Sequence, residues 1–581
     1  MPNQNKQTNY VQGEISRAIS NFFVVAYNSF CRCDADECGL GQSLNAAQTA
    51  NQITQLSKVP ASSAVSDYTL YDYKVSADGA TAVYRTSQPY SSADRLISVP
   101  TNGSRAPKQL NLTLPMNGTI KDFSISSDGK YVVYEADQRV AGQYELYSVL
   151  INGGTPKLLS FLPGNAGSVN THQISPDSRY VVYKYENNDG AAPINQLYTV
   201  PIRGGAAFKL SQTIGCDGQT SDAKSAVVFT PNSQYILFQY SITASKPGCV
   251  PTDNGAFNLY SIPVAGGSAK FLSAKFSPEI LVTSDSSTVV FTADLIPDGS
   301  DSLQLYSVPV TGGPILRLSQ IDEMVSANNQ DVREFDIAFP YPVIVYAYRR
   351  AGDPQYYTSS PRAFGFVMAN GTRPYNYPIN QDILNFKISP NNRGLVFLSA
   401  IPTADGSDTI NKLFSVTFQN NGRVQQLSDG EIPISDNYQI TSDGQRVVYQ
   451  TAAGDLSSVS INGGTILRIA NQVSQFALTP NGQAVVYPST PENSTSLSSL
   501  KVTSLVNGST QTLVSYGVDV LQSDKLRFLT ITGDGRRVVF VRGVYDRNGN
   551  LVLDEAGSPV EQLYSVTLPQ YAAGQAVQYK R

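Results

Sequence analysis

The sequence predicts an all-β protein, a β-propeller of about ten four-stranded blades, because two phrases alternate along the chain. The first reads h-x-[IV]-[ST]-x-[DN]-G-x-x-[VA]-V-[YF], as in "FSISSDGKYVVY" at 123–134. The second contains a Gly-Gly pair, as in "ELYSVLINGGTPKLLS" at 145–160. Recurrence at a regular spacing is the signature of a repeat architecture, and it overrides any domain count taken from length.

The Asp or Asn of the first phrase marks each unit, at positions 78, 128, 177, 232, 285, 391, 443, 481 and 534. Neighbouring markers lie 38–55 residues apart, except for one gap of 106. That gap leaves room for a degraded copy, "FDIAFPYPVIVY" at 335–346. Ten units therefore occupy residues 70–581.

Each unit reads as two β-hairpins. The first phrase is a strand, an Asp-Gly or Asn-Gly turn in which Gly accepts positive φ, and a second strand rich in β-branched and aromatic residues. A variable loop leads to a third strand, and the Gly-Gly pair turns the chain into a fourth. Val132 and Val133 are adjacent and point to opposite faces, so both faces of each sheet must be covered. Stacking units around an axis achieves this, which favours a propeller over an open β-solenoid.

The pattern "SPDG…VVY…A…LYSVP…GG…LS", best seen from Ser175 to Ser211 and from Ser126 to Ser160, resembles TolB-like or WD40-like (PD40) propeller repeats. The resemblance extends over nearly all of residues 70–581. It implies the propeller fold and a protein-interaction scaffold, although propellers host both binding modules and enzymes. Ten copies predict either one wide ring or two tandem propellers. The degraded copy, near residues 335–380, is a candidate seam or equally one elaborated blade.

Residues 1–69 lie outside the repeat and are expected to form a partly helical N-terminal arm. Apolar residues at 11, 15 and 19 have helical spacing, and the Ala- and Gln-rich segment 43–57 is also compatible with a helix. The arm carries "CRCDADEC", in which Cys31, Cys33 and Cys38 are candidates for an inter-subunit disulfide or, with neighbouring acidic residues, for a metal site.

Two further cysteines and one acidic loop suggest local sites. Cys216 and Cys249 flank the first hairpin of the fourth unit at the same end, which predicts a disulfide. In "YDRNGNLVLDEAG" at 545–557, a calcium-loop pattern places possible Ca²⁺ ligands at positions 1, 3, 5 and 9. Position 6 is Leu rather than Gly and the Glu at 12 is missing, so a polar hairpin tip is the alternative. The four possible ligands are Asp546, Asn548, Asn550 and Asp554.

Composition limits the partners and the compartment. The 42 Lys and Arg against 46 Asp and Glu give a net charge of −4, so no nucleic-acid partner is expected. Charged residues make up 15% of the chain, and such a weakly charged, Tyr- and Asn-rich surface suits an extracellular, cell-surface or periplasmic protein and self-assembly. No transmembrane segment is expected, and no signal peptide is visible in this numbering.

The single histidine, His172, occupies the first position of a strand phrase where other copies carry Phe123, Phe386 or Tyr438. We therefore interpret it as an amphipathic ring in an aromatic position. One histidine excludes a histidine-rich metal centre, and the absence of a G-x-S-x-G motif disfavours a serine hydrolase.

The first functional hypothesis is a non-catalytic scaffold that binds another protein or its own copies through blade loops and the N-terminal arm. The alternative is a carbohydrate-binding or hydrolytic propeller that uses the axial channel. Its site would be formed by loops that lead into the first strands, near Asp72, Asp122, His172 and Asp436.

Overall fold

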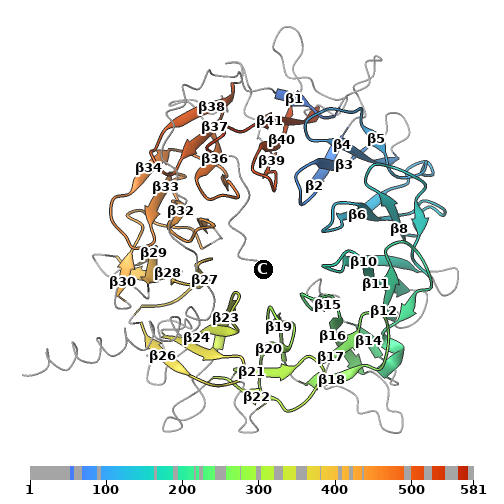
Figure 1. The fold of residues 1–581 in the computed structure, drawn as a ribbon, viewed down its shortest axis with the longest axis horizontal. Helices are drawn as coiled ribbons and strands as arrows, with labels where there is room; N and C mark the ends of the chain where they lie inside the picture. Colours follow the sequence, from blue (N-terminus) through green and yellow to red (C-terminus); the bar gives the residue numbers. More distant parts are fainter. Residues whose placement is uncertain are drawn as a thin grey trace, which may run out of the picture.

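The protein folds into a single closed ring of ten antiparallel sheets, the blades, around a central opening (Figure 1). This confirms the ten-bladed propeller. The computed structural model describes residues 53–57, 69–87, 93–161, 167–187, 194–214, 218–220, 227–242, 257–274, 276–295, 303–319, 332–348, 363–379, 381–403, 408–417, 423–434, 437–489, 499–515, 527–543 and 560–572.

Blades one to five follow one another along the chain, each from its inner strand outward. Their elements are β2 (Leu70–Val75), β3 (Thr81–Ser87), β4 (Asp94–Pro100) and β5 (Lys108–Gln109); β6 (Ile120–Ile125), β7 (Tyr131–Ala136), β8 (Glu145–Leu150) and β9 (Lys157–Leu158); β10 (Ser168–Ile174), β11 (Tyr180–Asn187), β12 (Ile194–Pro201) and β13 (Phe208–Lys209), then the 3-10 helix η2 (Ser211–Ile214); β14 (Gly218–Thr220), β15 (Val227–Phe229), β16 (Tyr235–Ile242), β17 (Asn258–Pro263) and β18 (Lys270–Ser273); and β19 (Phe276–Val282), β20 (Thr288–Ala293), β21 (Gln304–Pro309) and β22 (Leu316–Arg317).

Blades six to ten continue the ring, and the last one takes its outer strand from the other end of the chain. Their elements are β23 (Val332–Ala338), β24 (Val343–Tyr348), β25 (Ala363–Met368) and β26 (Tyr375–Pro378); β27 (Asn385–Ile388), β28 (Gly394–Pro402), β29 (Thr409–Thr417) and β30 (Val424–Gln426); β31 (Tyr438–Ile440), β32 (Arg446–Gln450), β33 (Leu456–Ser460) and β34 (Leu467–Ala470); β35 (Ala477–Leu478), β36 (Ala484–Ser489), β37 (Ser499–Ser504) and β38 (Thr510–Ser515); and β39 (Arg527–Ile531), β40 (Arg537–Gly543), β41 (Glu561–Thr567) and β1 (Ile53–Gln55).

Ten hydrophobic clusters fill the ten interfaces between neighbouring blades. Blade six, built from the degraded copy, shares one cluster with blade five through Val290 and Ile344 and another with blade seven through Phe364 and Phe397. Of the two predicted arrangements, the structure forms one wide ring. Residues 335–380 are one blade within it and not a seam between two propellers.

The ring closes through β1. Its register with β41 pairs Ile53 with Val566 and Gln55 with Tyr564, so it forms the fourth strand of blade ten. Leu56 is 1% exposed and packs in the cluster between blades ten and one. The helix expected over residues 43–57 is therefore wrong at its C-terminal end, because residues 53–55 satisfy their backbone groups by pairing with a strand that would otherwise be an open edge.

The first turn of each unit is held by its Ser or Thr. In blade two, Ser126 donates to Asp128 over 2.7 Å and accepts a hydrogen bond from the backbone N–H of Tyr131 over 2.9 Å. The same Ser/Thr-to-Asp/Asn bond recurs in all blades except the sixth, where Ala338 replaces the hydroxyl residue. The recurring phrase is thus explained by turn chemistry.

Three copies replace the turn glycine by serine, and the structure shows what the hydroxyl contributes. Ser178, Ser233 and Ser286 have φ near +60°, where a non-glycine residue is strained. Each hydroxyl accepts a hydrogen bond from a backbone N–H of the preceding blade, for example from Asp128 to Ser178 over 3.1 Å. These bonds offset the strain by joining neighbouring turns.

The Gly-Gly turn reverses the chain and also contacts the preceding blade. The first glycine of each pair lies in the left-handed region and beneath an outer-strand side chain of the preceding blade. A Cβ at Gly153 would lie 2.3 Å from Lys108, and one at Gly266 would lie 3.2 Å from the ring of Phe208. At the closure, Thr54 of β1 covers Gly103 in the same way.

We predict that β1 determines the stability of the ring. Deleting residues 1–60 removes β1 and Leu56, and should lower the stability of blades one and ten by at least the roughly 2–5 kcal/mol that loss of one buried Leu side chain costs. Deleting residues 1–50 leaves β1 in place and should leave the melting temperature unchanged. Circular dichroism melting and amide hydrogen exchange measure both; equal melting of the two variants would contradict the closure.

Candidate functional site

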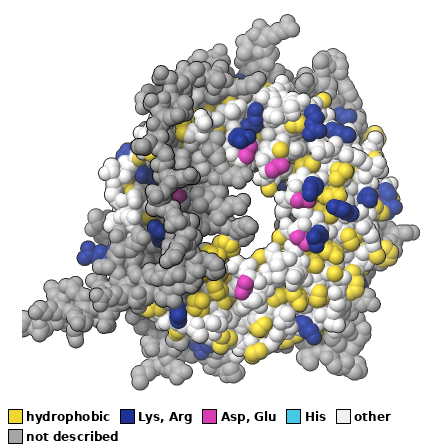
Figure 2. All heavy atoms as spheres, in the orientation of Figure 1, with side chains coloured by type: hydrophobic (Ala, Val, Ile, Leu, Met, Phe, Trp, Pro, Cys, Tyr) yellow, Lys and Arg dark blue, Asp and Glu magenta, His cyan; other side chains and the backbone are white. Residues whose placement is uncertain are grey.

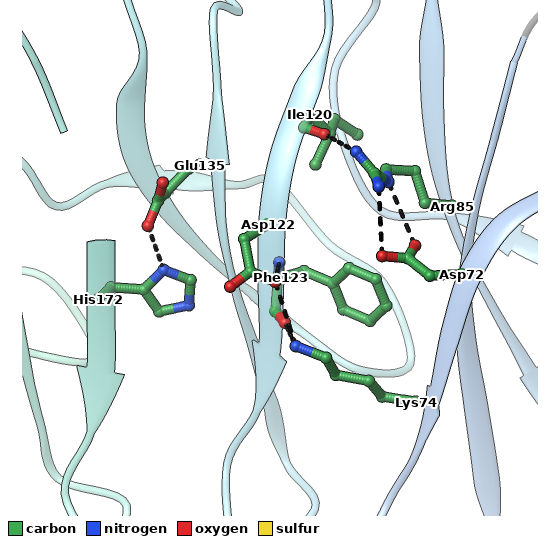
Figure 3. Close-up of polar contacts among 8 residues, drawn as sticks. All are labelled: Asp72, Lys74, Arg85, Ile120, Asp122, Phe123, Glu135 and His172. Atoms are coloured by element: carbon green, nitrogen blue, oxygen red, sulfur yellow. Dashed lines mark hydrogen bonds and ion pairs between the residues drawn. The ribbon is translucent and has the colours of Figure 1, made fainter. Parts of the chain in front are cut away.

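The candidate site lies on the inner strands of blades one to three, which border the central opening (Figure 1). Figure 2 shows acidic side chains beside this opening and most Lys and Arg side chains farther out. The inner strands β2, β6 and β10 and the second strands β3 and β7 supply the charged side chains of the site, which Figure 3 draws together.

The first charged pair joins blade one to blade two. The Arg85 guanidinium binds Asp72 through two hydrogen bonds of 3.2 Å, because the two residues are paired in register across β2 and β3. The same guanidinium donates to the backbone carbonyl of Ile120, on the inner strand of blade two. A planar guanidinium is suited to bind a carboxylate and a carbonyl simultaneously.

The second pair crosses the same interface. Lys74 of β2 donates to Asp122 over 3.2 Å and to the backbone carbonyl of Phe123, and its ammonium lies 4.9 Å from the centre of the Phe123 ring. Burial alone would raise the pKa of Asp122. The positive charge of Lys74, supported by His172, outweighs burial and lowers that pKa below its usual 3.8.

The third pair joins blade two to blade three and is buried. His172 Nδ1 lies 2.6 Å from a carboxylate oxygen of Glu135, and the exposed fractions of the two side chains are 0% and 1%. His172 Nε2 and the second carboxylate oxygen of Glu135 have no hydrogen-bond partner in the described part of the chain. The pair therefore occupies the interior of a blade interface.

The register confirms the position predicted for His172. It is paired with Tyr183 just as Phe123 is paired with Tyr134 and Tyr438 with Tyr449. The imidazole stands where other blades place an aromatic ring, with Glu135 facing it across the interface.

The chemistry open to this arrangement follows from its exposure. A carboxylate bound to Nδ1 orients an imidazole for proton transfer through Nε2. Here Nε2 is enclosed, so a molecule in the channel cannot reach it without displacing protein atoms. Asp122 is the most exposed carboxylate of the site, with 41% of its side chain exposed against 33% for Asp72, and it is ion-paired with Lys74. Across the described ranges, no three His, Cys, Asp or Glu side chains gather where they could hold a metal ion.

A similar contact recurs on the other side of the ring. Lys387 of blade seven donates to the backbone carbonyl of Tyr438 in blade eight over 3.0 Å, and its ammonium lies 4.5 Å from the centre of that ring. Lys74 and Lys387 occupy the same position of the repeat, directly after the first aromatic residue. The lysine contact is therefore a device for joining neighbouring inner strands.

The structure brings together three of the four residues proposed for a channel site, Asp72, Asp122 and His172. It adds Lys74, Arg85 and Glu135, which the sequence analysis missed. A signal was present, because the residue after the "VVY" strand is charged in units one to three, as Arg85, Glu135 and Lys184. Later units carry uncharged residues at this position.

Several predicted sites fall outside the described residues. These are Asp436, the thiols of Cys31, Cys33 and Cys38, the predicted disulfide between Cys216 and Cys249, and the possible Ca²⁺ ligands Asp546, Asn548, Asn550 and Asp554. They stay predictions. No helix among the described residues is long and apolar enough to cross a membrane.

No protein-family model matches the sequence, and no curated protein matches it. Among solved structures, the chain is similar to a eukaryotic initiation factor, with a TM-score of 0.42 and 10% identity over 72% of this chain and 93% of that one. It is also similar to an oligogalacturonate lyase in complex with manganese, with a TM-score of 0.34 and 12% identity over 87% of this chain and 99% of that one. For a putative TolB from Agrobacterium tumefaciens the TM-score is 0.24, with 17% identity over 47% of this chain and 84% of that one. These likenesses concern the fold alone.

We predict that the Glu135–His172 pair can be replaced by apolar residues only as a pair. H172F leaves the Glu135 carboxylate buried without its partner and should cost about 3–5 kcal/mol. E135L/H172F should restore stability to the wild-type level, because Leu398 and Tyr438 already pack at the equivalent positions of blades seven and eight. Urea unfolding followed by circular dichroism measures both variants, and a double variant no more stable than H172F would contradict the interpretation.

We predict an acid-sensitive contribution from Asp122. Because its pKa is lowered in the folded ring, its contact with Lys74 stabilises the fold above the usual pKa of 3.8 and is lost as the pH falls through the lower, folded value. D122N should therefore flatten the pH dependence of the melting temperature in the acidic range. A D122N profile parallel to the wild type would contradict the assignment. The control is D443N, in the first turn of blade eight, where blades four, seven and nine already carry Asn.

Proposed function

We propose that this chain is a non-catalytic propeller scaffold of an exported protein, at the cell surface or in the periplasm, which binds another protein or its own copies. The observation that carries the proposal is that the polar side chains of the inner and second strands contact a neighbouring blade. Arg85, Lys74 and His172, which line the blades nearest the predicted channel site, each contact an acidic side chain, and each such set of contacts joins one blade to the next.

The burial of His172 supports the same proposal. An acid–base site that serves a channel substrate requires a proton-transferring group within hydrogen-bond reach of that substrate. The side chain of His172, the single histidine of the chain, is 0% exposed, so it does not meet this requirement. Its contact with Glu135 instead supports a structural role in the interface. The weakly charged composition supports assembly, because repulsion between copies is small.

The rival function is a carbohydrate-binding or hydrolytic propeller. Its strongest support is Asp122, whose half-exposed carboxylate lies on the inner strand of blade two. The scaffold and the carbohydrate-binding or hydrolytic propeller predict different results for the same variants. One set of purified variants therefore distinguishes the two functions.

We predict that the purified chain forms assemblies larger than one ring, and that deleting residues 1–50 reduces them to single rings while β1 keeps each ring closed. Sedimentation velocity, with and without a reducing agent, measures the change. An unchanged distribution after the deletion would show that the arm does not link subunits.

The enzyme test uses wild type and D122N on neutral and acidic oligosaccharides. No turnover by either protein is expected. Turnover by the wild type that D122N abolishes would overturn the scaffold proposal in favour of the rival.

A further inference from the structure

The outer edge of the ring has an unusual charge distribution. We define the outer rim as the stretches of blades one to nine that contain the fourth strand and, except in blade seven, the turn that precedes it. These stretches are residues 100–112, 150–161, 201–214, 263–274, 309–319, 368–379, 423–428, 460–471 and 504–515. These stretches contain no Asp or Glu. They contain ten basic residues: Arg105, Lys108, Lys157, Arg203, Lys209, Lys270, Arg317, Arg373, Arg423 and Arg468.

This separation runs against the overall charge of the chain. Ten of its 42 basic residues lie in the outer rim, so 32 basic and all 46 acidic residues lie elsewhere, giving those parts a net charge of −14. The rim is thus a positive belt on an otherwise acidic protein. Opposite charge on a partner would be attracted to the belt and repelled by the rest of the ring.

The basic side chains of the rim are exposed, except for that of Lys209, which is partly buried. The fourth strands β5, β9, β13 and β22 are two residues long, and each is the last strand in the order of its sheet. Figure 1 shows β5, β18 and β22 at the outer edge of the ring. Lys157, Arg203 and Lys270 are exposed, on blades two, three and four. Arg468 of blade eight differs, because it forms an ion pair of 2.5 Å with Asp429, just beyond the rim. Arg373 of blade six and Arg423 of blade seven are exposed as well, so the exposed basic side chains extend from blade one to blade seven.

Large apolar side chains alternate with these charges. Phe161 and Phe271 are 61% and 53% exposed, and Leu158, Phe208 and Leu316 are also exposed. Single exposed apolar residues are ordinary on protein surfaces, but these follow one another on blades two to five. Phe208 packs against Gly266 of the next blade, and Lys157 donates to the backbone carbonyl of Arg203 over 3.2 Å. The rim is therefore one continuous surface from blade to blade.

We infer that the outer rim of blades two to five binds a protein partner whose surface carries both acidic and exposed apolar side chains. The inference rests on the proposed scaffold function and specifies its surface and the chemistry of its partner. The basic side chains would bind carboxylates, and Phe161 and Phe271 would anchor apolar side chains.

The shape and composition of the rim favour a protein over other anionic partners. The rim follows the convex circumference of the ring, and a flat membrane would touch only a short arc of it. Nucleic acid is bound mainly through its phosphates. The exposed Phe and Leu side chains of the rim would not contribute to such binding.

The test measures binding of a fluorescent synthetic peptide of alternating Asp and Leu to the full chain by fluorescence anisotropy. K157Q/R203Q/K270Q should weaken binding about tenfold, equal to about 1.4 kcal/mol. The control K130Q/R179Q/R536Q removes the same charge from exposed side chains that pair with the turn residues Asp128, Asp177 and Asp534 near the opening, and should bind as the wild type does.

A second variant separates the apolar contribution. F161S/F271S should weaken binding of the Asp-Leu peptide severalfold and leave binding of an Asp-Ser peptide unchanged. Added salt should weaken the binding of both peptides.

Two results would overturn the inference. One is equal weakening by the rim and control triple variants, or by neither. The other is tighter binding of the rim to phosphatidylserine vesicles or duplex DNA than to the peptide. Turnover of oligosaccharides would instead overturn the scaffold proposal and leave the binding data standing, so the two failures are distinguishable.

Discussion

The burial of both faces of every blade is the constraint on which this structure depends. A four-stranded sheet with Val132 on one face and Val133 on the other is unstable by itself, and each neighbour covers one of its faces. Both faces of all ten blades are covered only when the last blade packs against the first, which gives ten interfaces. The short strand β1 completes this closure, because it pairs with β41 and places Leu56 between blades ten and one.

The same need to join blades explains most of the polar groups near the opening. Turn serines accept bonds from the preceding blade, Lys74 and Lys387 cross to the next aromatic residue, and Glu135 contacts His172 across an interface. Residues that look like a site when read as a motif therefore make contacts that join one blade to the next. The surface that we propose for recognition is the outer rim, whose stretches contain no Asp or Glu.

Much of this architecture was predictable from single repeat units. The parts that the sequence did not predict were missed for physical reasons. The turn at Ser126–Asp128 and the Gly-Gly turn at Gly153 were read correctly, since short-range sterics and hydrogen bonds determine them. The strand at residues 53–55 was missed because its partner lies some 510 residues away in sequence. A signal did exist: "LS" at 56–57 matches the "LS" found at the end of the fourth strand, or just after it, in blades two to five and seven. Ser57 accepts a hydrogen bond from the backbone N–H of Leu563 as Ser160 does from that of Leu146.

The sequence by itself determined the repeated unit, the number of blades and the aromatic position of His172, because period-2 patterning and turn residues act within one unit. Only the tertiary structure decided that the ten blades form one ring, that residues 53–57 close it, and that Glu135 faces His172. These depend on contacts between units, where the register of one sheet against the next places side chains that are far apart in the chain.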